Sequence, residues 1–278
     1  GAPPLVIAHR GASGERPEHT LAAYALAIDQ GADFIEPDLV ITRDGVLVAR
    51  HDAELSLTTD VAAHAAFAPR RRTQLIDGRP VTGWFVEDFT LAELQRLRAR
   101  ERWPQWRAAS AAFDGQFGVP TLQQVIDLLR AKEAASGRRI GLYPETKHPA
   151  HFAALGLPLE PALVQTLHAA GWRTADAPVY LQSFEAASLR TLAALTPLRR
   201  VQLAGERTRV DAAALRAIAG YAQGVGVAKA LVIARDDAGR LGQPTPLVAQ
   251  AHAAGLRVHA WTFRREAVFL PSNLQGEP

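Results

Sequence analysis

The feature that most constrains the fold of this chain is a repeated alternation of short apolar runs with amphipathic segments. Runs such as Leu5–His9 and Val179–Phe184 are short and mostly apolar, which is typical of strands buried in a parallel sheet. Helical patterns lie between successive runs, for example after Thr20 and after Thr121, which are suitable helix caps. Serial strand–helix units predict a parallel sheet with right-handed crossovers.

A barrel fits this pattern better than a dinucleotide-binding fold, because no Gly-x-Gly-x-x-Gly motif follows the first strand. We therefore expect an α/β fold of the TIM (β/α)8 type, as a single domain over residues 1–278 with an inserted lobe at 53–120. Pro37 predicts an irregular second strand, and Val46–Val48 is read as the return arm of a hairpin. An eighth strand is not visible before Pro278. The expected strands are Leu5–His9, Phe34–Ile41, Ile140–Thr146, Val179–Phe184, Arg200–Leu203, Gly224–Val227 and Arg257–Phe263.

Composition removes several classes of function. The 278 residues include no Cys, which excludes disulfides, thiolate metal sites and a Cys nucleophile. The formal net charge is only +3, without the dense basic stripe of a nucleic-acid binder, so no nucleic-acid partner is expected. No apolar stretch is long enough to cross a bilayer, and no signal peptide is expected within these residues.

Charged side chains gather where the predicted strands end, which is where parallel barrels place their active sites. Carboxylates at such positions are almost never buried without a partner. Three of them, Glu36, Asp38 and Glu145, are hard oxygen donors that favour Ca²⁺ or Mg²⁺. Two histidines are suited to acid–base work, and two cationic side chains match phosphate oxygens. Together they describe a site that cleaves a phosphate ester. The residues are Glu36, Asp38 and Glu145 for the metal, His9 and His51 as acid and base, and Arg10 and Lys147 for phosphate.

Structural alternatives exist for the same residues. Glu36 and Asp38 can form salt bridges with Arg10 and Lys147 and bind no metal, but three carboxylates facing two cations leave one unpaired. Glu145 and Lys147 can form an ion pair that fills the barrel. Glu18 fits either a charge at a helix start or a partner for Arg10, and the sequence favours neither.

Several short polar motifs follow one another along the chain. They are His9-Arg10-Gly11, Pro17-Glu18-His19-Thr20, Glu36-Pro37-Asp38, Thr42-Arg43-Asp44-Gly45, His51-Asp52, Pro144-Glu145-Thr146-Lys147, Gln182-Ser183-Phe184 and Trp261-Thr262. Each motif is weak alone, whereas their order and spacing over roughly residues 5–264 are specific. Read in order, these motifs resemble the glycerophosphodiester phosphodiesterase family, most closely its periplasmic bacterial branch.

The resemblance implies a TIM barrel that hydrolyses glycerophosphodiesters, small molecules such as glycerophosphocholine or glycerophosphoethanolamine, to sn-glycerol 3-phosphate and an alcohol. It implies one divalent cation, with Ca²⁺ favoured and Mg²⁺ possible, held by the three carboxylates. Phe184 and Trp261 would contact the glycerol backbone. A hydroxyl of the glycerol would attack the phosphate first, and water would then open a cyclic phosphate. The expected location is periplasmic or secreted.

Two departures and two alternatives accompany this expectation. The family often has Asn where His19 stands, which concerns only a loop hydrogen bond, and it usually closes its barrel with a Gly-rich strand that this sequence lacks. A related lyase that stops at a cyclic phosphate shares the plan, as does a binding barrel without turnover. The sequence leaves the head group, the choice between Ca²⁺ and Mg²⁺ and the oligomeric state open.

Overall fold

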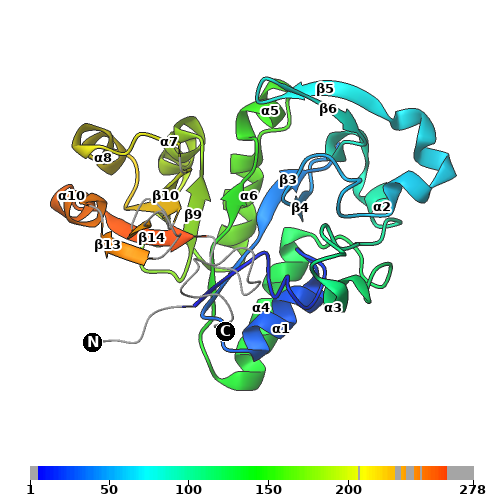
Figure 1. The fold of residues 1–278 in the computed structure, drawn as a ribbon, viewed down its shortest axis with the longest axis horizontal. Coiled ribbons are helices and arrows are strands. Elements are labelled where there is room, and N and C mark those ends of the chain that lie inside the picture. Colours follow the sequence, from blue (N-terminus) through cyan, green and yellow to red (C-terminus); the bar gives the residue numbers. More distant parts are fainter. Residues whose placement is uncertain (1–5, 206, 229–232, 236–240, 245, 262–278) are drawn as a thin grey trace. The chain divides into compact units, whose positions relative to one another are not determined.

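The computed structural model describes residues 6–205, 207–228, 233–235, 241–244 and 246–261 (Figure 1). It divides into two compact units, Gly1–Val179 and Tyr180–Pro278, and each is described here by itself. The single domain stays a prediction. The residues after Trp261, where no eighth strand is expected, lie outside the described part of the chain.

The first unit contains the strands that carry most of the predicted site. β1, β2 and β7 pair in parallel, β3 pairs in parallel with β8, and β4 returns antiparallel to β3 as the predicted hairpin arm. The hairpin turn includes Gly45 with a φ of +82°. These strands are β1 (Ile7–His9), β2 (Phe34–Glu36), β3 (Asp38–Ile41), β4 (Leu47–Ala49), β7 (Gly141–Leu142) and β8 (Glu145–Thr146).

The irregularity predicted at Pro37 is confirmed. Pro37 has no N–H to donate, and it separates β2 from β3. Its carbonyl still accepts a hydrogen bond of 3.0 Å from the backbone N–H of Glu145. The segment from Gly141 to Thr146 is divided in the same way, into β7 and β8, so the two broken strands run side by side. This register places Asp38 opposite Glu145.

Helices α1 (Leu21–Asp29) and α4 (Leu122–Ser136) pack against each other in this unit (Figure 1). Thr20 caps α1 as predicted, because its hydroxyl accepts from the N–H of Ala23. Thr121 caps α4 in a capping box with Gln124. On α1 the expected Tyr24 and Ile28 are buried, and with them Ala23 and Ala27. Leu21 and Ala25, which the apolar face was expected to include, are only half-buried.

Residues 53–120 hold only short elements. The helix predicted after Thr90 is present with a capping box, but α2 (Leu91–Leu94) ends before Leu97. β5 and β6 form a hairpin whose turn residues, Asp77 and Gly78, both have positive φ. That this segment is an inserted lobe stays a prediction. Its other elements are η1 (Val61–Ala63), η2 (Ala65–Arg70), β5 (Arg72–Ile76), β6 (Arg79–Gly83), η3 (Val86–Asp88) and α3 (Ala108–Ala111).

Two further helices complete the described part of the first unit. They are α5 (Pro149–Ala154), which the sequence interpretation did not anticipate, and α6 (Leu159–Ala169), which it did. α6 contacts β3 and β4, and its buried residues include Leu163 and Leu167. The residues of β3 and β4 are apolar except for Asp38, which begins β3.

The second unit repeats the strand–helix pattern as predicted. Its four parallel strands follow the order β9, β10, β11 and β14, and helices α7, α8 and α10 contact them. A short antiparallel pair, β12 and β13, was not predicted. The elements are β9 (Tyr180–Ser183), α7 (Ala186–Leu195), β10 (Arg199–Ala204), α8 (Ala212–Ala219), β11 (Gly224–Ala228), β12 (Ile233–Arg235), β13 (Leu241–Pro244), α10 (Leu247–Ala253) and β14 (Arg257–Trp261). Among the described residues, no helix has the length and apolarity needed to span a bilayer.

Candidate metal centre and active site

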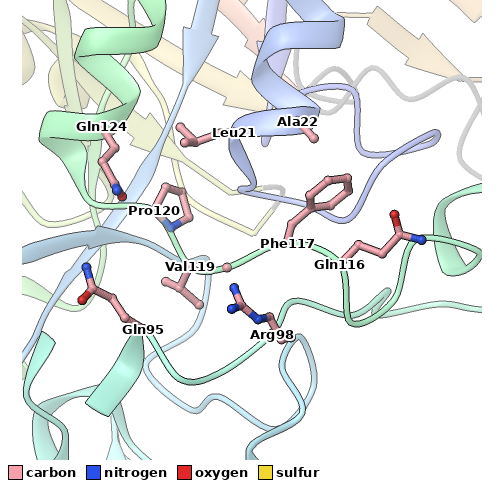
Figure 2. A pocket seen from close by; sticks show the side chains of 10 residues that line it. Leu21, Ala22, Gln95, Arg98, Gln116, Phe117, Val119, Pro120 and Gln124 are labelled. Carbon is pink, nitrogen blue, oxygen red and sulfur yellow. The ribbon is translucent and has the colours of Figure 1, made fainter. Parts of the chain in front are cut away.

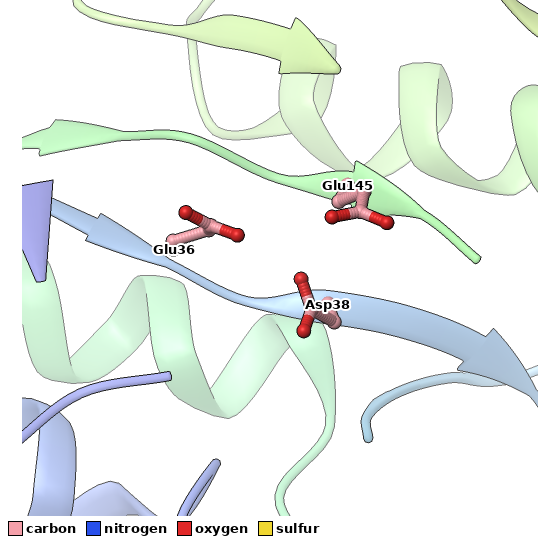
Figure 3. A group of neighbouring side chains, drawn as sticks. All are labelled: Glu36, Asp38 and Glu145. Carbon is pink, nitrogen blue, oxygen red and sulfur yellow. The ribbon is translucent and has the colours of Figure 1, made fainter. Parts of the chain in front are cut away.

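The predicted carboxylates meet at the broken strands of the first unit. Glu36 ends β2, Asp38 begins β3 and Glu145 begins β8, and Figure 3 shows their side chains directed toward a common space. One oxygen from each lies within 4.8 Å of the other two, and all three residues are buried. Such close packing of like charges is unfavourable unless a proton or a cation compensates.

The electrostatics of the cluster fit a divalent cation. Burial raises the pKa of Glu145 well above its usual value, and the Asp38 and Glu36 carboxylates add to this effect against the opposing charge of Lys147. Asp38 Oδ1 is buried and has no hydrogen-bond partner within the described part of the chain. Three oxygen donors of this kind suit Ca²⁺ or Mg²⁺.

Both predicted histidines lie next to this cluster. His9 Nδ1 is 2.8 Å from Glu36 Oε1, because β1 pairs with β2 in a register that sets His9 beside Glu36. His51 Nδ1 is 2.9 Å from Asp52 Oδ1, and its Nε2 is 3.4 Å from the ammonium group of Lys147. Burial lowers the pKa of His51 to about 4, and the charge of Arg10 acts in the same direction. The His51 ring is therefore neutral near pH 7.

The two cationic residues predicted to hold phosphate pair with different carboxylates, of which only one belongs to the cluster. Lys147 Nζ lies 3.1 Å from Glu145 Oε2, and Arg10 Nη1 lies 3.4 Å from Glu18 Oε1. Arg10 has a φ of +60°, an unusual conformation for a residue other than glycine. Gly11 follows it because α1 packs too closely for a side chain, since a Cβ there would lie 2.8 Å from the backbone of Ala23.

Glu18, which the sequence left open, is a partner for arginines. It is 1% exposed and accepts hydrogen bonds from Arg10 and Arg102, whose charges outweigh burial and hold the pKa of Glu18 well below its ordinary value. Arg102 also lies 2.5 Å from Asp52 Oδ2. One arginine from the 53–120 segment therefore connects Glu18 with the carboxylate that holds His51.

Sequence reasoning missed two groups of residues. His19 is fully buried, and its Nε2 lies 2.9 Å from Asp38 Oδ2, so the expectation that it affects only a loop hydrogen bond is wrong. Its Nδ1 contacts the Tyr24 hydroxyl. Arg50 is 1% exposed and donates to the carbonyls of Glu18 and His19. For His19, the signal in the sequence was the run of polar residues directly before the Thr20 cap.

Two predicted substrate contacts belong to the second unit. Phe184 follows β9 and is 45% exposed. Trp261 ends β14, and its side chain falls outside the described side chains. Their contact with glycerol stays a prediction.

Two cavities of the first unit differ in their relation to the site. The cavity in Figure 2, about 360 Å³, lies near the start of α1 and α4, and none of the predicted site residues lines it. A larger one, about 670 Å³, is lined by Asp52 and by His148, the neighbours of His51 and Lys147 in the chain. The larger cavity therefore adjoins the candidate active site.

The Glycerophosphoryl diester phosphodiesterase family model matches residues 9–273. A glycerophosphodiester phosphodiesterase of Arabidopsis thaliana is 36% identical over 299 residues, which cover 99% of this chain and 78% of that protein. One from Haemophilus influenzae is 38% identical over 160 residues, covering 52% of this chain and 40% of that protein.

Solved structures show the same similarity. A phosphodiesterase from Oleispira antarctica, in complex with the product sn-glycerol-3-phosphate, has a TM-score of 0.67 at 26% identity and covers 98% of this chain and 90% of its own. A glycerophosphodiester phosphodiesterase from Agrobacterium tumefaciens has a TM-score of 0.61 at 22% identity, with 95% of this chain and 89% of its own covered, and it supports the fold alone. The predicted α/β fold of TIM-barrel type is confirmed. The chain belongs to the glycerophosphoryl diester phosphodiesterase family and is an enzyme of the phosphoric diester hydrolase class.

Proposed function

We propose that this enzyme hydrolyses glycerophosphodiesters such as glycerophosphocholine or glycerophosphoethanolamine to sn-glycerol 3-phosphate and an alcohol, with a divalent cation. The observation that carries the proposal is the cluster of Glu36, Asp38 and Glu145 with a histidine beside it, His9 on Glu36. The product seen in the Oleispira antarctica phosphodiesterase supports the choice of product. A periplasmic or secreted location stays a prediction.

In this proposal the three carboxylates hold the cation, and their donor set favours Ca²⁺ with Mg²⁺ as the second possibility. When bound, the cation supplies positive charge that stabilises the developing charge on the phosphate and lowers the pKa of the attacking hydroxyl. The chain itself supplies further positive charge from Arg10 and Lys147. Their donors suit the phosphate oxygens, and Arg10 can donate two parallel hydrogen bonds.

The histidines are suited to proton transfer. His51 has a neutral ring whose Nδ1 is held by Asp52, so its Nε2, which lies 3.4 Å from the Lys147 ammonium group, is the nitrogen that can accept a proton. His9 lies beside the carboxylate cluster, with its Nδ1 2.8 Å from Glu36 Oε1, and its ring is the second candidate for proton transfer. A hydroxyl proton of the glycerol passes to one ring while the other ring protonates the leaving alcohol. The rings exchange roles when water opens the cyclic phosphate, so each returns to its starting state.

Identification of the product tests the proposal and separates it from its alternatives. We expect ³¹P NMR of a reaction with glycerophosphocholine to show conversion of the diester to sn-glycerol 3-phosphate, with cyclic glycerophosphate at most as a transient. Accumulation of the cyclic phosphate as the end product would instead establish the lyase. Unchanged diester after long incubation with Ca²⁺ and with Mg²⁺ would instead favour the alternative of a barrel that binds the diester without turnover.

A further inference from the structure

His19 is a buried histidine next to the carboxylate cluster, and hydrogen bonds hold both its backbone and its ring. His19 adopts a φ of +53°, and its backbone is held at both polar groups. Its N–H donates to the carbonyl of Arg10 at 3.0 Å, and its own carbonyl accepts from Arg50 at 2.9 Å. The ring is fully buried and directed at Asp38. An unfavourable backbone conformation that is fixed on both sides is typical of a site where orientation matters.

The two oxygens of Asp38 have different surroundings. Oδ2 lies 2.9 Å from His19 Nε2, whereas Oδ1 is buried without a hydrogen-bond partner in the described part of the chain. The carboxyl group cannot rotate without breaking its bond to His19. His19 therefore holds one oxygen of Asp38 and leaves the other for a cation.

The proton positions follow from the hydrogen-bonding capacity of the three groups. An ionised carboxylate only accepts, so His19 Nε2 must carry the proton that reaches Asp38. In a neutral ring Nδ1 is then an acceptor, and its partner is the hydroxyl of Tyr24. Tyr24 is itself fully buried on α1, and its hydroxyl also lies 3.5 Å from the backbone carbonyl of Glu36, a longer contact than the one with His19 Nδ1. A hydrogen-bonded chain thus runs from Tyr24 through His19 to Asp38.

We propose that His19 is a positioning residue for the metal ligand Asp38, and that the Tyr24 hydroxyl fixes the His19 ring as the Nε2–H tautomer. This inference rests on the proposed metal site. It assigns Asp38 Oδ1 as the ligand atom and gives the His19 ring a role in cation affinity. Hydrogen bonds from outside the ligand set commonly change metal affinity about 10-fold to 100-fold.

Cation binding by isothermal titration calorimetry tests the role of His19 without reference to activity. We expect His19→Leu to weaken Ca²⁺ and Mg²⁺ binding about 10-fold to 100-fold. His19→Asn keeps an amide N–H that can donate to Asp38, so it should recover most of the affinity. Tyr24→Phe keeps the shape of the side chain and removes only the hydroxyl, and it should have an intermediate effect. Tyr221→Phe is the matched control, because the Tyr221 hydroxyl is also buried but bonds Gln202 in the second unit.

The tautomer gives a second readout that does not depend on metal. We expect ¹⁵N NMR of the metal-free protein at pH 8 to show the proton of His19 on Nε2, and Tyr24→Phe to increase the Nδ1–H form. A proton on Nδ1 in the wild type would overturn the assignment. So would equal cation affinity in the wild type and in folded Tyr24→Phe and His19→Leu variants. A wild-type protein that binds neither cation would overturn the metal site as a whole. This outcome distinguishes failure of the proposed metal site from failure of the role of His19.

Discussion

Glu145→Gln is expected to lower kcat/KM for glycerophosphocholine by about 10³-fold, because a lost metal ligand removes roughly 4 kcal/mol of transition-state stabilisation. The substitution keeps the shape of the side chain and removes one of three carboxylates that lie within 4.8 Å of one another. Steady-state kinetics at saturating Ca²⁺ measure the loss, and cation titration should show a parallel loss of affinity.

Glu160→Gln is the control for this variant. Glu160 is also a buried glutamate, at the start of α6, but it lies outside the cluster. The Glu160→Gln substitution should therefore leave both activity and cation affinity near their wild-type values. The metal site would be rejected if Glu145→Gln, with its fold intact by circular dichroism, hydrolysed the diester at the wild-type rate.

His51→Ala is expected to lower kcat by about 10²-fold to 10⁴-fold, the range typical of a lost general acid or base. His51 is not one of the proposed metal ligands, so the cation affinity of the His51→Ala variant should stay near the wild-type value. This separation of turnover from metal binding distinguishes the histidine from the ligands. His64→Ala is the matched control, since His64 also contacts a carboxylate, Asp60 at 3.1 Å, but lies away from the cluster.

The pH profile provides a further check on His51. Burial first, and then the charge of Arg10, lower its pKa to about 4. The neutral ring is thus lost only as the pH falls through that value, and the acid limb of kcat/KM attributable to His51 should lie near pH 4. Retention of full turnover by His51→Ala would remove the histidine from the mechanism.

Much of the site could be predicted from the sequence because its parts follow regular strands. Glu36 and Asp38 are two residues apart, and the parallel pairing that joins Asp38 to Glu145 follows from serial strand–helix units. The strand break was also predictable, because Pro37 has no N–H to pair. Family resemblance then supplied roles that periodicity alone does not indicate.

The remaining parts depend on contacts between residues far apart in the chain. Arg102 belongs to the 53–120 segment, which has no regular pattern, yet it contacts Glu18 and Asp52. The sequence predicts only a loop hydrogen bond for His19, since its contact with Asp38 forms only when β3 and the start of α1 have folded together. A buried polar group of this kind depends on a hydrogen-bond partner that the fold brings near it. The hydrophobic periodicity of the sequence therefore says little about which polar residues are buried.

The most direct test of the central claim is the release of sn-glycerol 3-phosphate from glycerophosphocholine with Ca²⁺, then with Mg²⁺, then with a chelator, followed by addition of excess cation. The proposed metal site predicts release that requires a cation, stops with the chelator and returns when the cation is restored. Release that continues at the same rate in the presence of the chelator would contradict the assignment of Glu36, Asp38 and Glu145 as metal ligands, and no release under any condition would contradict the proposed activity.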